Sequence, residues 1–325
     1  MKLFVYSMRP YDEAAIFKRL SGKYNLEISS TEQTPCLENV KMATGYDVVD
    51  IITTPMTEEI LSAFKAVGVK CIATRTIGFD HIDLDAARKL GLGVVHVTYS
   101  PSTVADYAIM MMLIGLRKIP FIMQKAQAQD FTLNGSIGRE IEDCTVGVIG
   151  TGRIGKTVIR HLSGFGCRIL AYDVYPDEKL GVKYVSLDEL LRESDVITLH
   201  APGMDETFHM IGEKQFAEMK DGVVLINCAR GSLVDSDALL GALDSGKVGF
   251  AGLDVVENEA GLYYFNRMGE PLKNPELALL KSYPNVLVTP HTAFYTERAV
   301  SDMAENSIVA ALDYIQGKEN PFIVS

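Results

Sequence analysis

The sequence predicts an α/β protein with two doubly wound parallel sheets, one in each half of the chain. Over the first hundred residues, short apolar runs alternate with segments of helical periodicity, and the same alternation restarts at Thr145. Tyr99-Ser100-Pro101 interrupts the pattern between the two series. A chain of 325 residues is also longer than one hydrophobic core usually serves, which favours two domains.

The first series contains five expected strands, at residues 3–7, 26–30, 48–53, 70–76 and 94–98. Helical periodicity between them predicts helices over 12–20, 58–66 and 83–90. After the break, Ser102 is the expected N-cap of a long helix that continues to Arg117. A serine hydroxyl at that position can accept a hydrogen bond from the free N–H groups of the first helical turn.

The second series predicts strands at 145–149, 168–172, 183–185, 196–200, 223–228, 250–255 and 286–289, and a final helix over about 296–316. If that helix returns to the first sheet, the domains are 1–99 plus 296–325 and 100–295. The chain then crosses twice between domains, and a ligand cleft between them is expected. Residues 260–284 are rich in Gly, Pro, Asn and aromatics, and we expect a functional loop there.

A glycine triplet, Gly150, Gly152 and Gly155, stands between an apolar strand and a helical segment, and Asp173 ends the next strand. This order is typical of a Rossmann-type dinucleotide site. The first glycine makes the tight turn, the second admits a pyrophosphate, and the third lets the helix pack on the strand. The free N–H groups of the helix N-terminus favour phosphate. Asp173 would bind the ribose hydroxyls and repel a 2′-phosphate, so the expected cofactor is NAD.

The composition excludes several classes of partner. A net charge of −11 disfavours nucleic acid and anionic membranes, and the apolar stretch 108–116 is too short to span a bilayer. The N-terminus shows no signal-peptide pattern, so a cytoplasmic location is expected. No CxxC pair is present, and neither a disulfide framework nor a metal site is indicated. The scattered cysteines are Cys36, Cys71, Cys144, Cys167 and Cys228.

Three polar residues follow expected strands of the second series: Arg230, Glu259 and His291. Ligands of open parallel sheets bind beyond the carboxyl ends of the strands, which makes all three candidates for chemistry. Each also has an ordinary structural explanation. A strand-end arginine often makes a salt bridge, a loop glutamate is often solvated, and a histidine is often a surface or satisfied core residue. Spacing alone leaves both interpretations open.

Five motifs in order give the chain a resemblance to the D-isomer-specific 2-hydroxyacid dehydrogenases over nearly its whole length. After Glu259, most branches of that family have Pro, whereas this chain has Ala260-Gly261 and then an aromatic insertion. In this it resembles the D-lactate dehydrogenase branch, including the type found in vancomycin resistance. The motifs are TIGFDHID (76–83), YSP (99–101), VGVIGTGRIG (146–155), NCARGSLVD (227–235) and TPHTA (289–293).

The resemblance implies that Arg230 grips the substrate carboxylate, that Glu259 orients His291, and that His291 transfers the proton. The chemistry fits these residue types. A guanidinium fork matches a planar carboxylate. Hydride arriving at the carbonyl carbon builds negative charge on oxygen, which a protonated imidazole can quench, and a nearby carboxylate stabilises that imidazolium.

The resemblance also implies further contacts with the cofactor and the substrate. Asp254 would reach the nicotinamide amide, and Ile77 and Gly78 would offer backbone N–H groups to the substrate carboxylate. The other implied substrate contacts are Tyr99 and Phe294. The other implied cofactor contacts, beside the three glycines and Asp173, are Arg153, Ile154, Ala201, Pro202, Thr207, Cys228, Ala229 and Arg230.

The expected substrate is a 2-oxo monocarboxylate. No Lys or Arg occurs between Lys41 and Lys65, a stretch that lines the substrate cleft in the family, and a second carboxylate would need a cation there. Pyruvate, reduced to D-lactate, is the leading candidate, and bulkier acids such as 2-oxoisocaproate or phenylpyruvate are the alternative. A dinucleotide-sensing corepressor shares the fold but receives less support. The resemblance suggests a homodimer.

Overall fold

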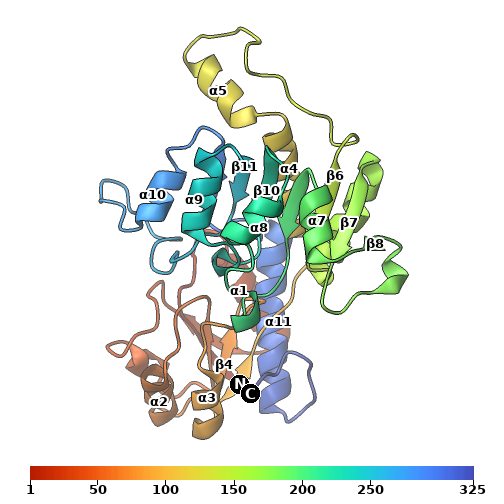
Figure 1. The fold of residues 1–325 in the computed structure, drawn as a ribbon. Coiled ribbons are helices and arrows are strands. Elements are labelled where there is room, and N and C mark those ends of the chain that lie inside the picture. The colour runs from red at the N-terminus through yellow and green to blue at the C-terminus, as the bar shows by residue number, and fades with distance from the viewer. The chain divides into compact units, whose positions relative to one another are not determined.

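The structure, a computed structural model, describes residues 1–325 as two compact units (Figure 1). One unit contains residues 1–100 and 295–325, and the other contains residues 101–294. Each junction lies one residue from the one expected from the sequence. The expected ligand cleft between the domains stays a prediction.

The first unit is a five-stranded sheet with helices on both faces. Its strands are β1 (Lys2–Val5), β2 (Glu27–Ser30), β3 (Val48–Ile51), β4 (Cys71–Thr74) and β5 (Gly93–Val95), and its helices are α1 (Ala14–Tyr24), α2 (Glu58–Ala66), α3 (Leu84–Leu90) and α11 (Glu297–Ile315). The strand order is β2-β1-β3-β4-β5, and all pairs are parallel. One face buries an apolar core under α2 and α3, and the other under α1 and α11.

A buried ion cluster fixes the carboxyl ends of the strands in this unit. The Arg75 side chain is fully buried, and its Nη1 lies 2.8 Å from Oδ1 of Asp50. Its Nε lies 3.3 Å from Oε1 of Glu13, and its Nη2 donates to the carbonyl of Tyr6 at 3.1 Å. The hydroxyl of Ser307 in α11 donates to Asp50 at 2.7 Å. Because charges this deep must be paired, the cluster fixes the chain just before residues 76–79.

The second unit is a seven-stranded parallel sheet. Its strands are β6 (Thr145–Ile149), β7 (Arg168–Tyr172), β8 (Lys183–Tyr184), β9 (Val196–Leu199), β10 (Val223–Asn227), β11 (Val248–Leu253) and β12 (Val286–Val288). Its helices are α4 (Ser102–Leu116), α5 (Ile119–Gln127), α6 (Arg153–Leu162), α7 (Leu187–Glu193), α8 (Glu213–Glu218), α9 (Ser236–Asp244) and α10 (Pro275–Leu280). The largest apolar cluster lies between the sheet and α7 to α10 (Figure 1).

The strand order β12-β11-β10-β9-β6-β7-β8 places β6 between β7 and β9. From β6 the chain runs outward to β7 and β8, and it then crosses back to β9 on the other side of β6. The connections that follow β6 and β9 therefore run in opposite directions, which marks the switch point where doubly wound sheets bind ligands. The order of the first unit is that of a flavodoxin-like sheet, and the order of the second is that of a Rossmann sheet. The predicted α/β fold class with two doubly wound parallel sheets is confirmed.

Two local predictions differ from the structure, and one observed helix lies outside the predictions. Ser102 is not the N-cap of α4: Pro101 takes that place with φ −67° and ψ −17°, and Ser102 is the first helical residue. The ring of proline sets a φ that suits entry into a helix, so the first turn can begin directly after Pro101. The segment 260–284 is not loop throughout, because α10 lies inside it with Asn274 as its N-cap. Helix α5 is absent from the sequence-based prediction, and none of its residues is buried.

Apolar side chains also lie exposed on the arm that follows α5, which Figure 1 shows standing apart from the sheet of its unit. Phe131, Leu133 and Ile137 are 78%, 87% and 84% exposed. No helix in the structure combines the length and apolar character needed to cross a membrane.

Candidate active site

The turn between β6 and α6 requires two of its three glycines on steric grounds. Gly150 has φ +90°, and a Cβ there would lie 2.6 Å from the carbonyl carbon of His200. A Cβ at Gly155 would lie 1.9 Å from the carbonyl oxygen of Gly150. At Gly152, by contrast, a Cβ would meet no protein atom within 4 Å, and φ −65° suits any residue. Packing of the fold therefore leaves glycine at 152 unexplained, and close approach of a pyrophosphate accounts for it.

Asp173 follows β7 beside this turn. Its Oδ2 accepts hydrogen bonds from the N–H and the hydroxyl of Thr151 at 2.6 and 3.0 Å, and its Oδ1 accepts the N–H of Tyr175 at 2.8 Å. Partial burial acts to raise the pKa of this carboxyl, but the hydrogen bonds from Tyr175 and Thr151 outweigh it and hold the pKa below its ordinary value. A carboxylate offers about four lone-pair positions, so this oriented anion retains acceptor capacity for ribose hydroxyls.

The loops after β9 and β10 carry the other predicted cofactor residues. Ala201, Pro202 and Thr207 follow β9, and the hydroxyl of Thr207 donates to the carbonyl of Pro202 at 2.7 Å, which closes that loop. The thiol of Cys228 is buried, 3.8 Å from the sulfur of Met111. A contact between Cys228 and the cofactor would therefore come from its backbone.

Glu259 and His291 form a carboxylate–imidazole pair in the loops after β11 and β12. Oε1 of Glu259 lies 2.6 Å from Nδ1 of His291, and its Oε2 accepts the N–H of Val256 at 3.0 Å. Both side chains are about one quarter exposed. Because Glu259 takes Nδ1, the Nε2 atom has no partner in the protein and is the nitrogen that can exchange a proton with a substrate.

Asp254, which is fully buried, clamps the loop that carries His291. Its Oδ1 accepts the hydroxyl of Thr289 at 2.6 Å and the N–H of Thr292 at 2.8 Å, and its Oδ2 accepts the N–H of Ala293 at 2.9 Å. Its carbonyl accepts the N–H of His291 at 2.8 Å. His291 has φ +53°, in the left-handed region that few non-glycine residues adopt. Both carboxylate oxygens serve this clamp, and the contact with nicotinamide stays a prediction.

Arg230 follows β10, beside the loop that carries Glu259. Its Nη1 donates to the carbonyl of Ala229 at 2.8 Å. At the next residue, Gly231, a Cβ would lie 2.2 Å from the carbonyl carbon of Val256, so only glycine lets the two loops pack. The structure thus brings Arg230 to the same edge of the sheet as the Glu259–His291 pair.

Phe294 lies in an aromatic cluster that the sequence did not predict as a unit. Its ring centroid is 6.3 Å from that of His291 and 6.4 Å from that of Tyr264, and Tyr264 is 6.1 Å from His291. The hydroxyl of Tyr264 donates to the carbonyl of His291 at 3.0 Å. The only sequence signal for Tyr264 is its place in an aromatic run, which does not say which ring turns toward the histidine.

Ile77, Gly78 and Tyr99 belong to the first unit. The hydroxyl of Thr76 donates to the carbonyl of Gly78 at 2.6 Å, and Nδ1 of His96 lies 3.0 Å from the carbonyl of Ile77. These contacts fix the carbonyls, while the N–H groups of Ile77 and Gly78 find no acceptor within the protein. Two adjacent N–H donors of this kind suit a carboxylate.

Residues 109–293 match the sequence profile of the D-isomer specific 2-hydroxyacid dehydrogenase, NAD binding domain. The chain belongs to the D-isomer-specific 2-hydroxyacid dehydrogenase family. The resemblance seen in the motifs is confirmed, and so are the enzymatic class, an NAD-dependent D-2-hydroxyacid dehydrogenase, and the cofactor, NAD. The confirmed enzymatic class takes precedence over the interpretation of the chain as a corepressor.

Relatives extend the likeness to nearly the full length. The chain is 44% identical to an "Aromatic 2-oxoacid reductase" of Clostridium sporogenes, over 95% of both proteins. It is also 44% identical to a "D-specific alpha-keto acid dehydrogenase" of Enterococcus faecalis, over 93% of this chain and 94% of the relative. Among solved structures, a D-lactate dehydrogenase of Treponema pallidum matches with a TM-score of 0.91 and 32% identity, and each chain is covered in full.

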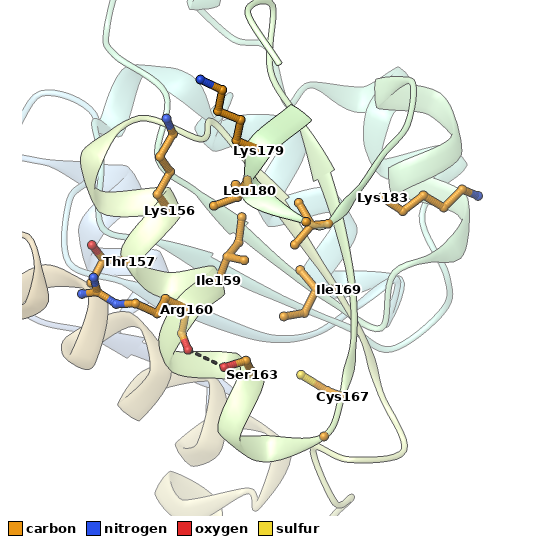
Figure 2. Close-up of a pocket in the computed structure, with 13 residues that line it drawn as sticks. Lys156, Thr157, Ile159, Arg160, Ser163, Cys167, Ile169, Lys179, Leu180 and Lys183 are labelled. Atoms are coloured by element: carbon orange, nitrogen blue, oxygen red, sulfur yellow. Dashed lines mark hydrogen bonds between the residues drawn. The ribbon is translucent and has the colours of Figure 1, made fainter. Parts of the chain in front are cut away.

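A cavity of about 690 Å³ lies between α6, β7 and the segment 179–183 (Figure 2). Four cationic side chains border it, Lys156, Arg160, Lys179 and Lys183, around aliphatic residues such as Ile169. Lys156 already pairs with Asp177 and Lys183 with Glu189. None of the predicted site residues of this dehydrogenase lines the cavity.

Proposed function

We propose that this dehydrogenase reduces 2-oxo monocarboxylates to D-2-hydroxy acids, with Arg230, Glu259 and His291 as the groups that hold and protonate the substrate. One observation carries the proposal: Nδ1 of His291 lies 2.6 Å from Oε1 of Glu259, which leaves Nε2 for the substrate oxygen. NADH, when bound, supplies the hydride. The protein must then hold a carboxylate, deliver one proton and keep the substrate in a single orientation.

Each step has a residue of fitting chemistry. Arg230 can grip the carboxylate with two parallel N–H bonds, and the N–H groups of Ile77 and Gly78 are suited to the same group. His291 in its protonated form donates from Nε2 to the carbonyl oxygen as negative charge develops there. Glu259 stabilises the imidazolium and fixes the plane of the ring, held in turn by the N–H of Val256. In the reverse direction the neutral imidazole is the base.

The 2-oxo acid substrate can carry one of two kinds of side chain, a methyl group or an aromatic ring. The likeness to the lactate branch favours pyruvate, with D-lactate as the product. The ring cluster of Tyr264 and Phe294 beside His291 favours an aromatic 2-oxo acid such as phenylpyruvate, because aromatic rings gain more from packing on one another than a methyl group does. The name of the Clostridium sporogenes relative supports the second class. We infer that both acids are reduced and that kcat/KM is higher for phenylpyruvate.

The test is a panel of 2-oxo acids with NADH, followed by the loss of nicotinamide absorbance and by chiral chromatography of the products. We expect D-hydroxy acids from pyruvate, 2-oxoisocaproate and phenylpyruvate, and little turnover of a dicarboxylate such as oxaloacetate. Absence of turnover with every acid, or an L-product, contradicts the proposal. A higher kcat/KM for pyruvate than for phenylpyruvate removes only the preference for aromatic acids.

We also propose that the protein is a homodimer and works in a reducing compartment, the cytoplasm. The exposed apolar residues Phe131, Leu133 and Ile137, together with a helix α5 that buries none of its own residues, support an interface with a second copy. All five cysteines are free thiols, which supports a reducing location. Sedimentation velocity tests the first proposal, and fractionation of cells tests the second.

A further inference from the structure

The aromatic insertion, residues 260–284, contacts the Glu259–His291 pair through Tyr264. The Tyr264 hydroxyl donates to the carbonyl of His291 at 3.0 Å, and its ring lies 6.1 Å from the imidazole, centroid to centroid. Tyr264 has φ +69° and His291 has φ +53°. Left-handed backbone at non-glycine residues costs energy and persists only where other contacts enforce it. Both ends of this hydrogen bond are therefore held in conformations that the chain would not choose locally.

The insertion that carries Tyr264 is anchored on both sides. Asn274 is 5% exposed, and its Nδ2 donates to the carbonyl of Glu257 at 3.0 Å while its Oδ1 accepts the N–H of Leu277 at 2.8 Å. Nearer to Tyr264, Nη2 of Arg267 donates to the carbonyl of Gly261 at 2.8 Å. Tyr264 thus belongs to a segment that is held by hydrogen bonds on both sides, and its own hydrogen bond to the carbonyl of His291 restricts the motion of the imidazole.

The other hydrogen bonds of His291 use its N–H and its Nδ1, whereas its carbonyl accepts the hydrogen bond from Tyr264. The N–H of His291 is bound by the carbonyl of Asp254, and Nδ1 is bound by Glu259. Without the tyrosine hydroxyl, the peptide that follows His291 loses the hydrogen bond on its carbonyl. That peptide can then rotate, and rotation changes where Nε2 points.

The ring of Tyr264 adds a second consequence. It is 52% exposed and stands with Phe294 around the imidazole. A 2-oxo acid has a trigonal carbonyl carbon with three substituents: the oxygen, the carboxylate and the side chain. With the oxygen at His291 and the carboxylate at Arg230, the side chain projects in the third direction. Tyr264 and Phe294 offer the apolar surface beside the imidazole on which a bulky side chain can pack.

We propose that Tyr264 is a positioning residue for His291, through its hydroxyl, and a specificity-determining residue for aromatic 2-oxo acids, through its ring. The inference rests on the proposed function, because it takes His291 as the proton donor. Two substitutions separate the two roles, since Tyr264→Phe removes the hydroxyl alone and Tyr264→Leu removes the aromatic ring as well.

For Tyr264→Phe, kcat should fall about fivefold with pyruvate and with phenylpyruvate alike, as expected for one lost hydrogen bond at the reacting group. The KM for NADH and the thermal midpoint should stay the same. The matched control is Tyr283→Phe, which removes a tyrosine hydroxyl from the same insertion; that hydroxyl donates to Asp244 at 2.6 Å and not to the histidine loop. The control should keep the kcat of the wild type. A Tyr264→Phe enzyme with the kcat of the wild type overturns the positioning role.

For Tyr264→Leu, kcat/KM for phenylpyruvate should fall about fivefold further than kcat/KM for pyruvate, because only the aryl acid loses a ring contact. An unchanged ratio between the two acids, measured against Tyr264→Phe, overturns the specificity role. Failure of the proposed function looks different: the wild type would then reduce no 2-oxo acid, and this inference would fall with it. A fall in kcat accompanied by a lower thermal midpoint in Tyr264→Phe would mean a structural role only and would also overturn the inference.

Discussion

Replacement of Asp254 by Asn tests whether this residue clamps the histidine loop or serves the cofactor. The carboxylate accepts three short hydrogen bonds from residues 289, 292 and 293, at 2.6, 2.8 and 2.9 Å. An asparagine can keep its oxygen toward Thr289 and Thr292, but its NH₂ group then faces the N–H of Ala293. One charge-assisted hydrogen bond is lost and one buried N–H is left without an acceptor.

Those two losses together come to about 3 kcal/mol, which corresponds to about a hundredfold change in the population of the correct loop conformation. We expect kcat of Asp254→Asn to fall by up to that factor. The KM for NADH should change little, and the amide of Ala293 should exchange its hydrogen faster. The exposed Asp244, which accepts the hydroxyl of Tyr283, provides the control Asp244→Asn.

The kinetic constants and amide exchange are measured on the same preparations, by stopped-flow absorbance and by mass spectrometry. A large rise in the KM for NADH, with kcat and the exchange of residues 291–293 unchanged, would refute the clamp. That result would favour a direct contact between Asp254 and nicotinamide.

Four further outcomes are expected. His291→Ala should lower kcat about a hundredfold or more while NADH still binds, measured by fluorescence titration, and equal loss of both would show that the proton is supplied elsewhere. Arg230→Lys keeps the charge but loses the fork, so the KM for the 2-oxo acid should rise about tenfold, and an unchanged KM would argue against a bidentate grip. Asp173→Ser removes an anion beside the glycine turn, so the ratio of kcat/KM for NADH over NADPH should fall about tenfold; a fixed ratio would place the discrimination at another group. Leu133→Asp puts a charge on the exposed arm and should shift sedimentation toward monomers, whereas an unchanged coefficient would contradict a dimer contact through this arm.

Much of the fold follows from local sequence pattern. Buried parallel strands read as continuous apolar runs, and the observed strands overlap every predicted one, with ends that differ by up to a few residues. Gly150 and Gly155 are also predictable from the sequence, because the turn between strand and helix brings backbone atoms so close to both positions that a Cβ would clash with them. Helix α5 could not be found in this way, since it buries no residue and so carries no core-facing stripe that would need a partner within one chain.

Some residues of the site can likewise be predicted from the sequence, whereas others are found only in the structure. Arg230, Glu259 and His291 stand out because each follows a strand whose end is visible in the sequence, and the resemblance assigns their roles. Tyr264 does not stand out, because its contact with the carbonyl of His291 joins residues 27 positions apart through loops without periodicity. The resemblance implies that Asp254 faces the cofactor, and only the structure shows how much of its carboxylate binds the backbone of the histidine loop.

Eight non-glycine residues have positive φ, and Asn258, Tyr264 and His291 are among them, all in the loops around the proton donor. Glycine adopts such φ values without strain, so at Asn258 and Tyr264, where the imidazole itself is kept, replacement by glycine would relieve the backbone. Glycine would also give the loops freedom that the present side chains deny them. We therefore expect glycine variants at positions 258 and 264 to be slower enzymes even where they are more stable. The backbone strain in these loops is the cost of holding the imidazole of His291 in one orientation.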